Sequence, residues 1–264
     1  MPDLQYVFVT GATGAIGRAI AANMAKSGQY HVVLIVRDEK KAEKVIAEIR
    51  KKSGNPNVEH LIIDLADHRQ IYDLAQSWDK PLDVLINNAA ASPRERQENN
   101  YGIEIQFATN VLGYFSMMHA FTPHLVKSSK PRIVNVASYW AGGLDFSDLQ
   151  FKKRRYNNDA AYRQSKQADR MLSTAFAGKL KDHPVCVNAC HPGDVNSQLS
   201  NDLGFGGFET PDQGAETPVW LATSPAGINN SGKYFEHKKE TLCHFSQDRE
   251  AVYRLYDLCA EMVS

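Results

Sequence analysis

Short apolar runs alternate with amphipathic stretches along most of this chain. The run Gln5–Thr10 is rich in β-forming residues, whereas the apolar positions of Ile16–Lys26 recur with the period of a helix. Further strands are predicted at His31–Val36, Asn57–Ile63, Leu82–Ile86, Arg132–Ala137, Val185–Cys190 and Lys233–Phe235. Further helices are predicted at Glu39–Lys52, Asp67–Trp78, Gly102–Val126, Asn158–Lys181, Pro211–Ala222 and Gln247–Met262. This order predicts an α/β protein, a single-domain Rossmann fold over residues 1–264 with a doubly wound parallel sheet of about seven strands flanked by helices.

A glycine-rich turn joins the first predicted strand to the first helix. The segment Thr10–Gly17 places glycines at 11, 14 and 17. Glycines there permit a tight turn and let the backbone approach a pyrophosphate, which would lie on the free N–H groups at the helix N-terminus. The turn could also serve chain geometry alone, but its place between strand and helix favours dinucleotide binding.

The end of the second strand indicates which dinucleotide is bound. An acidic residue as the strand's terminal residue would bind ribose hydroxyls, whereas this chain has Arg37 there and Arg18 just after the glycine turn. Two guanidinium groups suit a 2′-phosphate, so we expect NADP(H) as the cofactor. The alternative is that Arg37 forms a surface ion pair with Asp38 or Glu39.

A tyrosine and a lysine lie four residues apart in the helix predicted at Asn158–Lys181. Tyr162 and Lys166 would project from one face of that helix, about one turn apart. An ammonium beside a phenol favours the phenolate, so the pair could exchange a proton near neutral pH. The alternative is an exposed aromatic ring and a solvated lysine.

Polar residues and two long loops follow the carboxyl ends of the predicted strands. Asp64 and Asn87 fall at those ends, where doubly wound sheets bind their ligands. The segments near 139–157 and 194–210 combine aromatic and leucine residues with, in the second, several glycines. We interpret both as substrate-binding loops or lids, with plain loop packing as the alternative.

The balanced charge of the chain indicates that any binding or catalytic function depends on a local site and not on the overall charge. Lys+Arg and Asp+Glu both total 30, so nothing in the overall charge favours nucleic acid. The basic run Lys152–Arg155 could attract an anionic substrate, although a solvated loop is the simpler interpretation. Neither the histidines nor the four cysteines have metal-ligand spacing, so no metal is expected. No export signal or membrane anchor precedes the first strand, and we expect a cytoplasmic protein.

Taken in order, these segments resemble the short-chain dehydrogenase/reductase family. The motifs behind the resemblance are Thr10–Gly17, Asn87-Asn88-Ala89, Asn110, Ser138, Tyr162–Lys166 and Pro192-Gly193. The branch that the chain resembles most is that of the retinol dehydrogenases and related carbonyl reductases, on the evidence of Leu144–Leu149, His191-Pro192-Gly193 and Ser231–Phe235.

The resemblance implies a role for each of these positions. Tyr162 would be the general acid/base, Lys166 would lower its pKa and hold the nicotinamide ribose, and Ser138 would hydrogen-bond the substrate oxygen. Asn110 would hold a water in the proton relay. The implied cofactor-binding residues are Gly11, Thr13, Gly14, Ala15, Ile16, Gly17, Arg18, Arg37, Asp64, Leu65, Asn88, Ala89, Ala90, Tyr162, Lys166, Pro192, Gly193, Val195 and Ser197.

Three features depart from the family pattern. Ala15 replaces the middle glycine of the usual turn while Gly14 is gained, which predicts a rearranged cofactor turn. Ala90 replaces the glycine of the Asn-Asn-Ala-Gly segment. No amino-terminal anchor of the kind found in many retinol dehydrogenases precedes the first predicted strand, which argues against a membrane-dissolved retinoid as the substrate. We expect a hydrophobic aldehyde or ketone, or the corresponding alcohol.

Two other functions compete with a reductase. A non-catalytic NADP-binding regulator or scaffold would not need Asn110, Ser138, Tyr162 and Lys166, all of which are present in order. A sugar epimerase or dehydratase would need a larger carboxy-terminal region. Self-association into a homo-oligomer is left open by the sequence.

Overall fold

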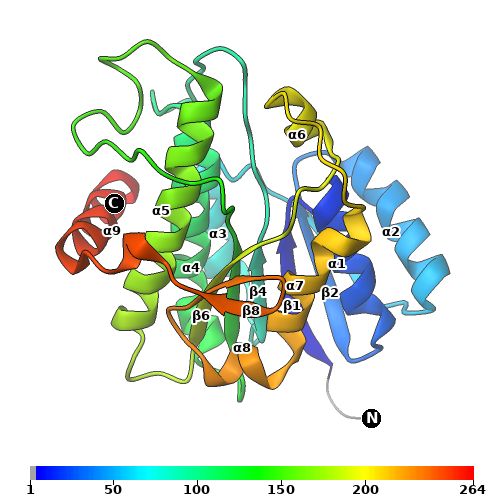
Figure 1. Ribbon diagram of the computed structural model, residues 1–264. Helices are drawn as coiled ribbons and strands as arrows, with labels where there is room; N and C mark the ends of the chain where they lie inside the picture. The colour runs from blue at the N-terminus through cyan, green and yellow to red at the C-terminus, as the bar shows by residue number, and fades with distance from the viewer. Residues whose placement is uncertain (1–3) are drawn as a thin grey trace.

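The structure, a computed structural model, describes residues 4–264. Over these residues eight strands form one sheet in the order β3-β2-β1-β4-β5-β6-β7-β8 (Figure 1). The strands are Gln5–Thr10 (β1), Tyr30–Val36 (β2), Val58–Ile62 (β3), Val84–Asn87 (β4), Arg132–Val136 (β5), Cys186–His191 (β6), Tyr234–Glu236 (β7) and Lys239–Thr241 (β8). All neighbouring pairs are parallel except β7 and β8. The doubly wound parallel sheet is therefore confirmed, with an antiparallel edge strand added to the seven expected.

The helices are Ala15–Lys26 (α1), Glu39–Ser53 (α2), His68–Ser77 (α3), Gly113–Leu125 (α4), Asn158–Lys179 (α5), Gln198–Asp202 (α6), Pro211–Thr223 (α7), Pro225–Asn229 (α8) and Arg249–Val263 (α9). A π-helix, Phe107–Leu112 (η1), precedes α4, and a 3₁₀ turn, His244–Ser246 (η2), precedes α9. Within residues 4–264, none of these helices is long and apolar enough to cross a membrane.

Side chains at the helix starts explain several of these boundaries. Asp38 begins α2 by accepting a hydrogen bond from the Lys41 N–H at 3.0 Å. Asn157 begins α5 in the same way, accepting from the Ala160 N–H at 2.8 Å. The start of α5 sets the angular position of Tyr162 one turn later, so this cap helps to aim the candidate acid.

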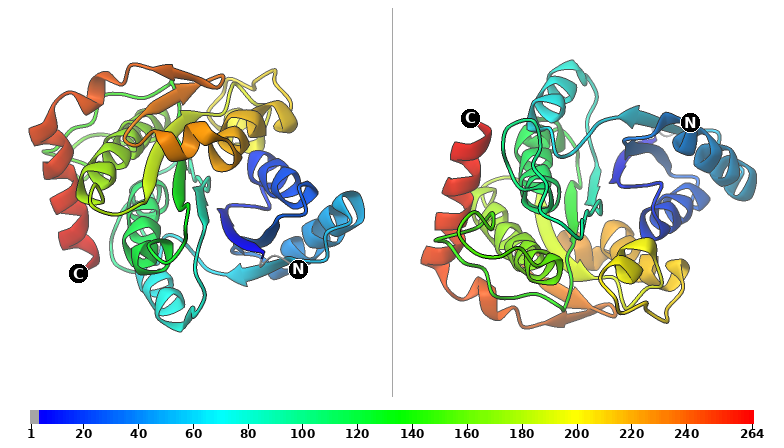
Figure 2. Two further views of the ribbon diagram at one scale, coloured as in Figure 1. Left: turned by 90° about the horizontal axis from the view of Figure 1, so that it is seen from below. Right: turned by 90° about the horizontal axis from the view of Figure 1, so that it is seen from above.

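Two apolar layers hold the sheet between its helices. One face is covered by α1, α2 and α7 through residues such as Ile20, Ile46 and Leu221. The other face is covered by α3, α4 and α5, with α9 packed outside α5 (Figure 2). Because strands buried on both faces need mostly apolar side chains, β1 and β4 contain continuous hydrophobic runs, whereas β5 includes the buried polar residue Asn135.

Two segments fold differently from the sequence prediction. The helix predicted from Gly102 starts later, with η1 as its first turns, and the strand predicted at Lys233–Phe235 is one residue later and continues into a hairpin. His237 and Lys238 form the two-residue turn of that hairpin with φ of 47° and 63°. Such turns usually carry Asn or Gly, so this sequence gives little signal for β8.

Candidate active site

In the glycine turn, the backbone that follows β1 packs closely against the backbone that follows β4. Gly11 has φ of +63°, and a Cβ added to it would lie 2.7 Å from the Ala89 Cα. A Cβ on Gly17 would overlap the Gly11 carbonyl oxygen and lie 2.5 Å from Asn88 Nδ2. Only glycine fits at these two positions, and the close approach leaves the N-terminus of α1 open toward the cleft.

The substitution at Ala15 does not disturb this turn. Gly14 is the N-cap of α1 in an extended conformation, and Ala15 is the first helical residue. Among residues 4–264, the non-glycine residues with positive φ are Phe151, His237 and Lys238, so Ala15 needs no glycine-like backbone. Strand, turn and helix follow one another, with Thr13 in the turn, and the expected rearrangement relative to the usual family turn stays a prediction.

Asn88 and Ala89 brace the turn from the neighbouring strand. Both backbone N–H groups donate to Thr10 Oγ1, at 2.8 and 3.0 Å, and Asn88 Nδ2 donates to the Thr10 carbonyl at 2.9 Å. These bonds fix β1 against β4 at the point where the strand order reverses, which is where doubly wound sheets bind ligands. Ala90 follows, half-buried.

The two candidate phosphate-binding arginines differ in how they are held. Arg37 is exposed at the end of β2, and within residues 4–264 it forms no ion pair or side-chain hydrogen bond. Asp38 instead caps α2 and lies 3.6 Å from the Lys41 ammonium, so the expected alternative, an Arg37 ion pair with its neighbour, is not formed. Arg18 lies 3.6 Å from Glu48 on α2, with both side chains about half exposed.

The two predicted cofactor-binding residues after β3, Asp64 and Leu65, differ in how far they are buried. Asp64 is half-buried, and its Oδ1 accepts from the Ala66 N–H at 3.0 Å. Leu65 is 4% exposed and packs in the core, where a Cβ on Gly113 would be 2.9 Å from its carbonyl oxygen. Leu65 could therefore meet a cofactor through its backbone only, whereas Asp64 has a partly accessible carboxylate.

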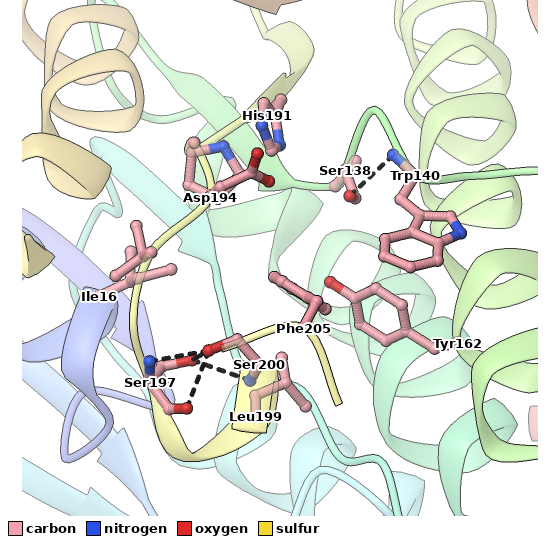
Figure 3. A pocket seen from close by; sticks show the side chains of 14 residues that line it. Ile16, Ser138, Trp140, Tyr162, His191, Asp194, Ser197, Leu199, Ser200 and Phe205 are labelled. Atoms are coloured by element: carbon pink, nitrogen blue, oxygen red, sulfur yellow. Dashed lines mark hydrogen bonds between the residues drawn. The ribbon is translucent and has the colours of Figure 1, made fainter. Parts of the chain in front are cut away.

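Ser138 and Tyr162 line one cavity that is open to solvent at one side. Its walls also include Ile16, Ala137, Trp140, His191, Pro192, Gly193, Asp194, Val195, Ser197, Leu199, Ser200 and Phe205. Figure 3 shows the Tyr162 hydroxyl directed into this space, with Ser138 on the same wall. Ser138 Oγ accepts from the Trp140 N–H at 3.0 Å and keeps its own proton as a donor, for the Tyr162 hydroxyl or for a substrate oxygen. The cavity therefore holds two hydroxyl donors next to the glycine turn.

Lys166 lies close to Tyr162 but is bound by another residue. Its Nζ donates to Asp169 Oδ2 at 2.8 Å and to the Val136 carbonyl at 3.0 Å. Burial lowers the pKa of Lys166, but the Asp169 carboxylate and Tyr114 together outweigh it, and the net shift is upward. Burial raises the pKa of Asp169 to about 6 against the opposing effect of Lys166.

The prediction that Lys166 makes Tyr162 more acidic is wrong for this structure. Burial raises the Tyr162 pKa above its ordinary value, the Asp169 charge raises it further, and a hydrogen bond with Ser138 lowers it only in part. The physical reason is that the ammonium is paired with a buried carboxylate, so it offers little net charge to the phenol.

Asn110 lies on η1 and is fully buried. Its Oδ1 accepts from the Ala91 N–H at 2.8 Å, while Nδ2 donates to the Ala91 carbonyl and to Ser165 Oγ, each at 3.1 Å. The side chain thus joins the segment after β4 to helix α5. Its role in holding a relay water stays a prediction.

The two long segments predicted as lids rise above the carboxyl ends of the strands (Figures 1 and 2). Residues of both segments line the cavity. The second contains α6, which Ser197 and Ser200 begin through a reciprocal capping box. The Phe208 and Glu209 N–H groups both donate to the Asp194 carbonyl, at 2.8 and 3.0 Å. This segment is therefore a hydrogen-bonded loop, and the Ser197 hydroxyl is used in its own cap.

The first segment is organised around a carboxylate. Asp148 is buried, and it accepts from the backbone N–H groups of Lys152, Lys153 and Arg154, at 2.7 to 3.2 Å. The Arg154 side chain also bonds Asp148, while the rest of the basic run is exposed. These contacts support the solvated-loop interpretation of Lys152–Arg155.

Several cavity residues were not predicted as site residues. His191, just before the Pro-Gly turn, is 5% exposed, and burial, His237 and Arg170 lower its pKa to about 4. Asp194 Oδ2 accepts from the Tyr139 hydroxyl at 3.3 Å. Phe205 lies 5.4 Å from Trp140, centroid to centroid. His191 is the last residue of β6 and Asp194 comes three residues later, and this position at the carboxyl end of a strand is the signal that could have identified them.

Comparisons with known proteins agree with this geometry. The family model for short chain dehydrogenases matches residues 5–204. Retinol dehydrogenase 13 of Mus musculus is 33% identical, over 97% of this chain and 83% of its own. Retinol dehydrogenase 14 of Homo sapiens is 32% identical, over 97% and 85%.

Two solved structures share the fold. An uncharacterized protein from Mycobacterium paratuberculosis superimposes with a TM-score of 0.83 at 25% identity, covering 98% of this chain and 93% of that one. A short chain dehydrogenase from Escherichia coli CFT073, in complex with NADPH, gives 0.72 at 22% identity, covering 89% and 97%. With the family match and the retinol dehydrogenase relatives, these findings show that the chain belongs to the short-chain dehydrogenase/reductase family of oxidoreductases, in its retinol dehydrogenase-like branch.

Proposed function

We propose that this protein is an NADP(H)-dependent oxidoreductase that reduces hydrophobic aldehydes or ketones, or oxidises the corresponding alcohols. The observation that carries the proposal is the cavity in which the Ser138 and Tyr162 hydroxyls meet beside the glycine turn. Two donors aimed at one point are what a carbonyl oxygen needs when negative charge develops on it.

The residues present fit a dinucleotide with a 2′-phosphate. The tight contacts of Gly11 and Gly17 leave room for a pyrophosphate at the N-terminus of α1, and Arg37 has no competing partner within residues 4–264. The E. coli relative of the same fold was solved with NADPH. Such a cofactor would supply a hydride, and Ile16, Gly193 and Val195 would line its nicotinamide end.

The reaction then needs one proton from the chain. Ser138 donates a hydrogen bond to the substrate oxygen, and Tyr162 gives its hydroxyl proton to that oxygen as the C=O bond is reduced to C–O–H. The resulting phenolate takes a proton back from solvent. Because the Tyr162 pKa is raised, the phenol stays protonated throughout the neutral range, which suits an acid in the reducing direction.

The substrate class follows from the cavity walls. Trp140, Leu199 and Phe205 place apolar surface around the two hydroxyls. Two curated relatives are named for long apolar alcohols, retinol dehydrogenase 13 and the human polyprenol dehydrogenase. These observations support a bulky hydrophobic carbonyl over a small polar one.

The test is a screen of the purified protein with NADPH against aldehydes and ketones of graded size, following the loss of NADPH absorbance. Tyr162→Phe should lower kcat at least about a hundredfold and leave NADPH affinity nearly unchanged, since it deletes the proton and keeps the ring. Tyr253→Phe, on α9 outside the cavity, is the matched control. Retention of most activity in Tyr162→Phe would show that the proton comes from another group.

A non-catalytic NADP-binding regulator is the second candidate, and one observation favours it. The pairing of Lys166 with Asp169 leaves the phenol without an activating charge. This candidate predicts NADPH binding by calorimetry with no turnover of any carbonyl. The screen and the binding measurement together separate the two functions.

A further inference from the structure

Asp169 is a buried acid that the proposed reaction does not yet use. It lies on α5, three residues after Lys166, and the two side chains are 0% and 3% exposed. Asp169 Oδ2 holds the Lys166 ammonium at 2.8 Å, while Asp169 Oδ1 is buried with no hydrogen-bond partner within residues 4–264. Burying a carboxylate costs free energy of folding unless the charge is paired. Here the charge of Asp169 is paired with the candidate catalytic lysine.

The groups around this pair come from four other elements and α5 itself. The Lys166 ammonium lies 5.0 Å from the Tyr114 ring centroid on α4 and 5.8 Å from that of Tyr162 on α5. On β5 the neighbour is the Val136 carbonyl, which accepts from Lys166.

The remaining titratable neighbours are thiols, Cys190 on β6 and Cys259 on α9. Burial raises the pKa of both, and it also raises that of Tyr114, so all three stay neutral at ordinary pH. After burial, the Asp169 charge is the main influence that raises the pKa of Tyr162, and Lys166 is the charge paired with Asp169.

We infer that Asp169 is a positioning residue of the Tyr162 site: by binding Lys166 it takes up the ammonium charge, holds Nζ against β5, and keeps Tyr162 a protonated, weak acid. The inference rests on the proposed function, because it assigns Asp169 to the proton-transfer step. An ammonium alone would favour the phenolate, whereas an ammonium paired with a carboxylate is close to neutral at the distance of the phenol. Asp169 thereby sets the pH at which Tyr162 can act as a base.

The direct test is a spectroscopic titration that needs no activity. Phenolate absorbance is recorded against pH for the full chain and for Tyr162→Phe, and the difference isolates Tyr162. In the otherwise unchanged chain this difference should show no step below about pH 11, since an unperturbed tyrosine already titrates near 10. With Asp169→Asn, which keeps the shape and removes the charge, the step should move down by at least about one pH unit.

The second readout is the pH profile of kcat/KM for alcohol oxidation, in which Tyr162 must accept the proton. The rate should fall as the pH drops below the Tyr162 pKa, and Asp169→Asn should move this break to lower pH by the same interval. A merely structural role would lower the rate at every pH and leave the break in place. Asp159→Asn, an acid in the first turn of the same helix and outside the pair, is the matched control and should move neither readout.

The outcomes separate the two proposals. If no carbonyl or alcohol is turned over, the proposed function fails, and the phenolate titration still tests Asp169. If Asp169→Asn does not fold, Asp169→Ala removes the same charge with a smaller side chain and should shift the step in the same direction. A Tyr162 step that stays at the same pH in a folded, charge-removed variant overturns the inference.

Discussion

The two sides of the cleft are built on different principles. The glycine-turn side, residues 5–65 and 84–90, holds its shape through backbone contacts such as those of Gly11, Gly17 and Thr10. The catalytic side, residues 137–209, depends on side chains brought together from distant elements. Buried polar side-chain atoms differ in number: among the described residues one such atom on the glycine-turn side, Asn87 Oδ1, has no hydrogen-bond partner, whereas the catalytic side has four, Asp169 Oδ1, Arg170 Nε, His191 Nδ1 and Glu209 Oε2.

That difference indicates where the chemistry lies. Folds normally satisfy their buried polar groups, and exceptions gather where a ligand or a reaction uses them. The glycine-turn side leaves one such atom unsatisfied and is held mainly by close backbone contacts. The catalytic side leaves more of them unsatisfied, and one of these, His191 Nδ1, belongs to a residue that lines the cavity.

The largest effect on stability and cofactor binding is expected from a substitution in the glycine turn. Gly17→Ala should cost about 3 kcal/mol of unfolding free energy and remove most NADPH affinity, because the new Cβ overlaps the Gly11 carbonyl and Asn88. Urea unfolding and calorimetry measure the two effects. Gly14→Ala is the matched control: its Cβ would lie 3.3 Å from the Gly11 oxygen, with an ordinary backbone, so we expect a loss below about 1 kcal/mol. Equal effects of the two changes would show that close packing is not the constraint.

The next effect tests an unsatisfied group on the catalytic side. His191 has a pKa lowered from 6.5 to about 4, mainly by burial, so the unfolded chain takes up a proton below pH 6.5 that the folded chain refuses until about pH 4. Neutral His191 therefore contributes to the free energy of unfolding in full above pH 6.5. This contribution is lost as the pH falls toward 4, by about 1.4 kcal/mol per pH unit and at most about 3 kcal/mol in total. Urea unfolding across this window measures it.

His191→Gln should flatten that part of the pH dependence, while the exposed His183→Gln should leave it unchanged. An unchanged slope in His191→Gln would mean that another group carries the acid sensitivity.

Sequence reasoning succeeded where the constraint was local. The strand, turn and helix around Gly11 and Gly17 follow from glycine spacing and apolar period, and each lies where predicted. The helix α6 was missed, because Ser200 rather than Glu or Gln occupies the third position of its capping box.

Asp169 shows why the catalytic side could not be predicted in full. In the sequence, an acid three residues after Lys166 looks like an ordinary pair on a helix surface. Only the packing of α4 and α9 against α5 buries both charges and turns a weak surface contact into the dominant electrostatic neighbour of Tyr162.

A smaller effect separates the two arginines of the glycine-turn side. Arg37→Ala should weaken NADPH binding about tenfold or more and leave NADH binding nearly unchanged, since a charge-assisted contact to the 2′-phosphate contributes about 1.5–3 kcal/mol. Arg18→Ala should have a lesser effect, because Arg18 already shares its charge with Glu48. Calorimetry with both cofactors measures the preference. If Arg37→Ala binds the two cofactors in the original ratio, Arg37 does not contact the phosphate.

The smallest expected effect sharpens the description of the catalytic side. Phe205 lines the cavity and lies 5.4 Å from Trp140, so Phe205→Ala removes an aromatic contact worth about 0.5–1.5 kcal/mol and opens one wall. KM for a bulky hydrophobic carbonyl should therefore rise about three- to tenfold, while kcat stays nearly constant, since the proton donors are untouched. Phe208→Ala is a matched control on the same segment, because Phe208 is 83% exposed and does not line the cavity. Steady-state kinetics with one large and one small aldehyde would distinguish the cases: an equal rise in KM for both aldehydes would mean that Phe205 holds the segment in place without contacting the substrate.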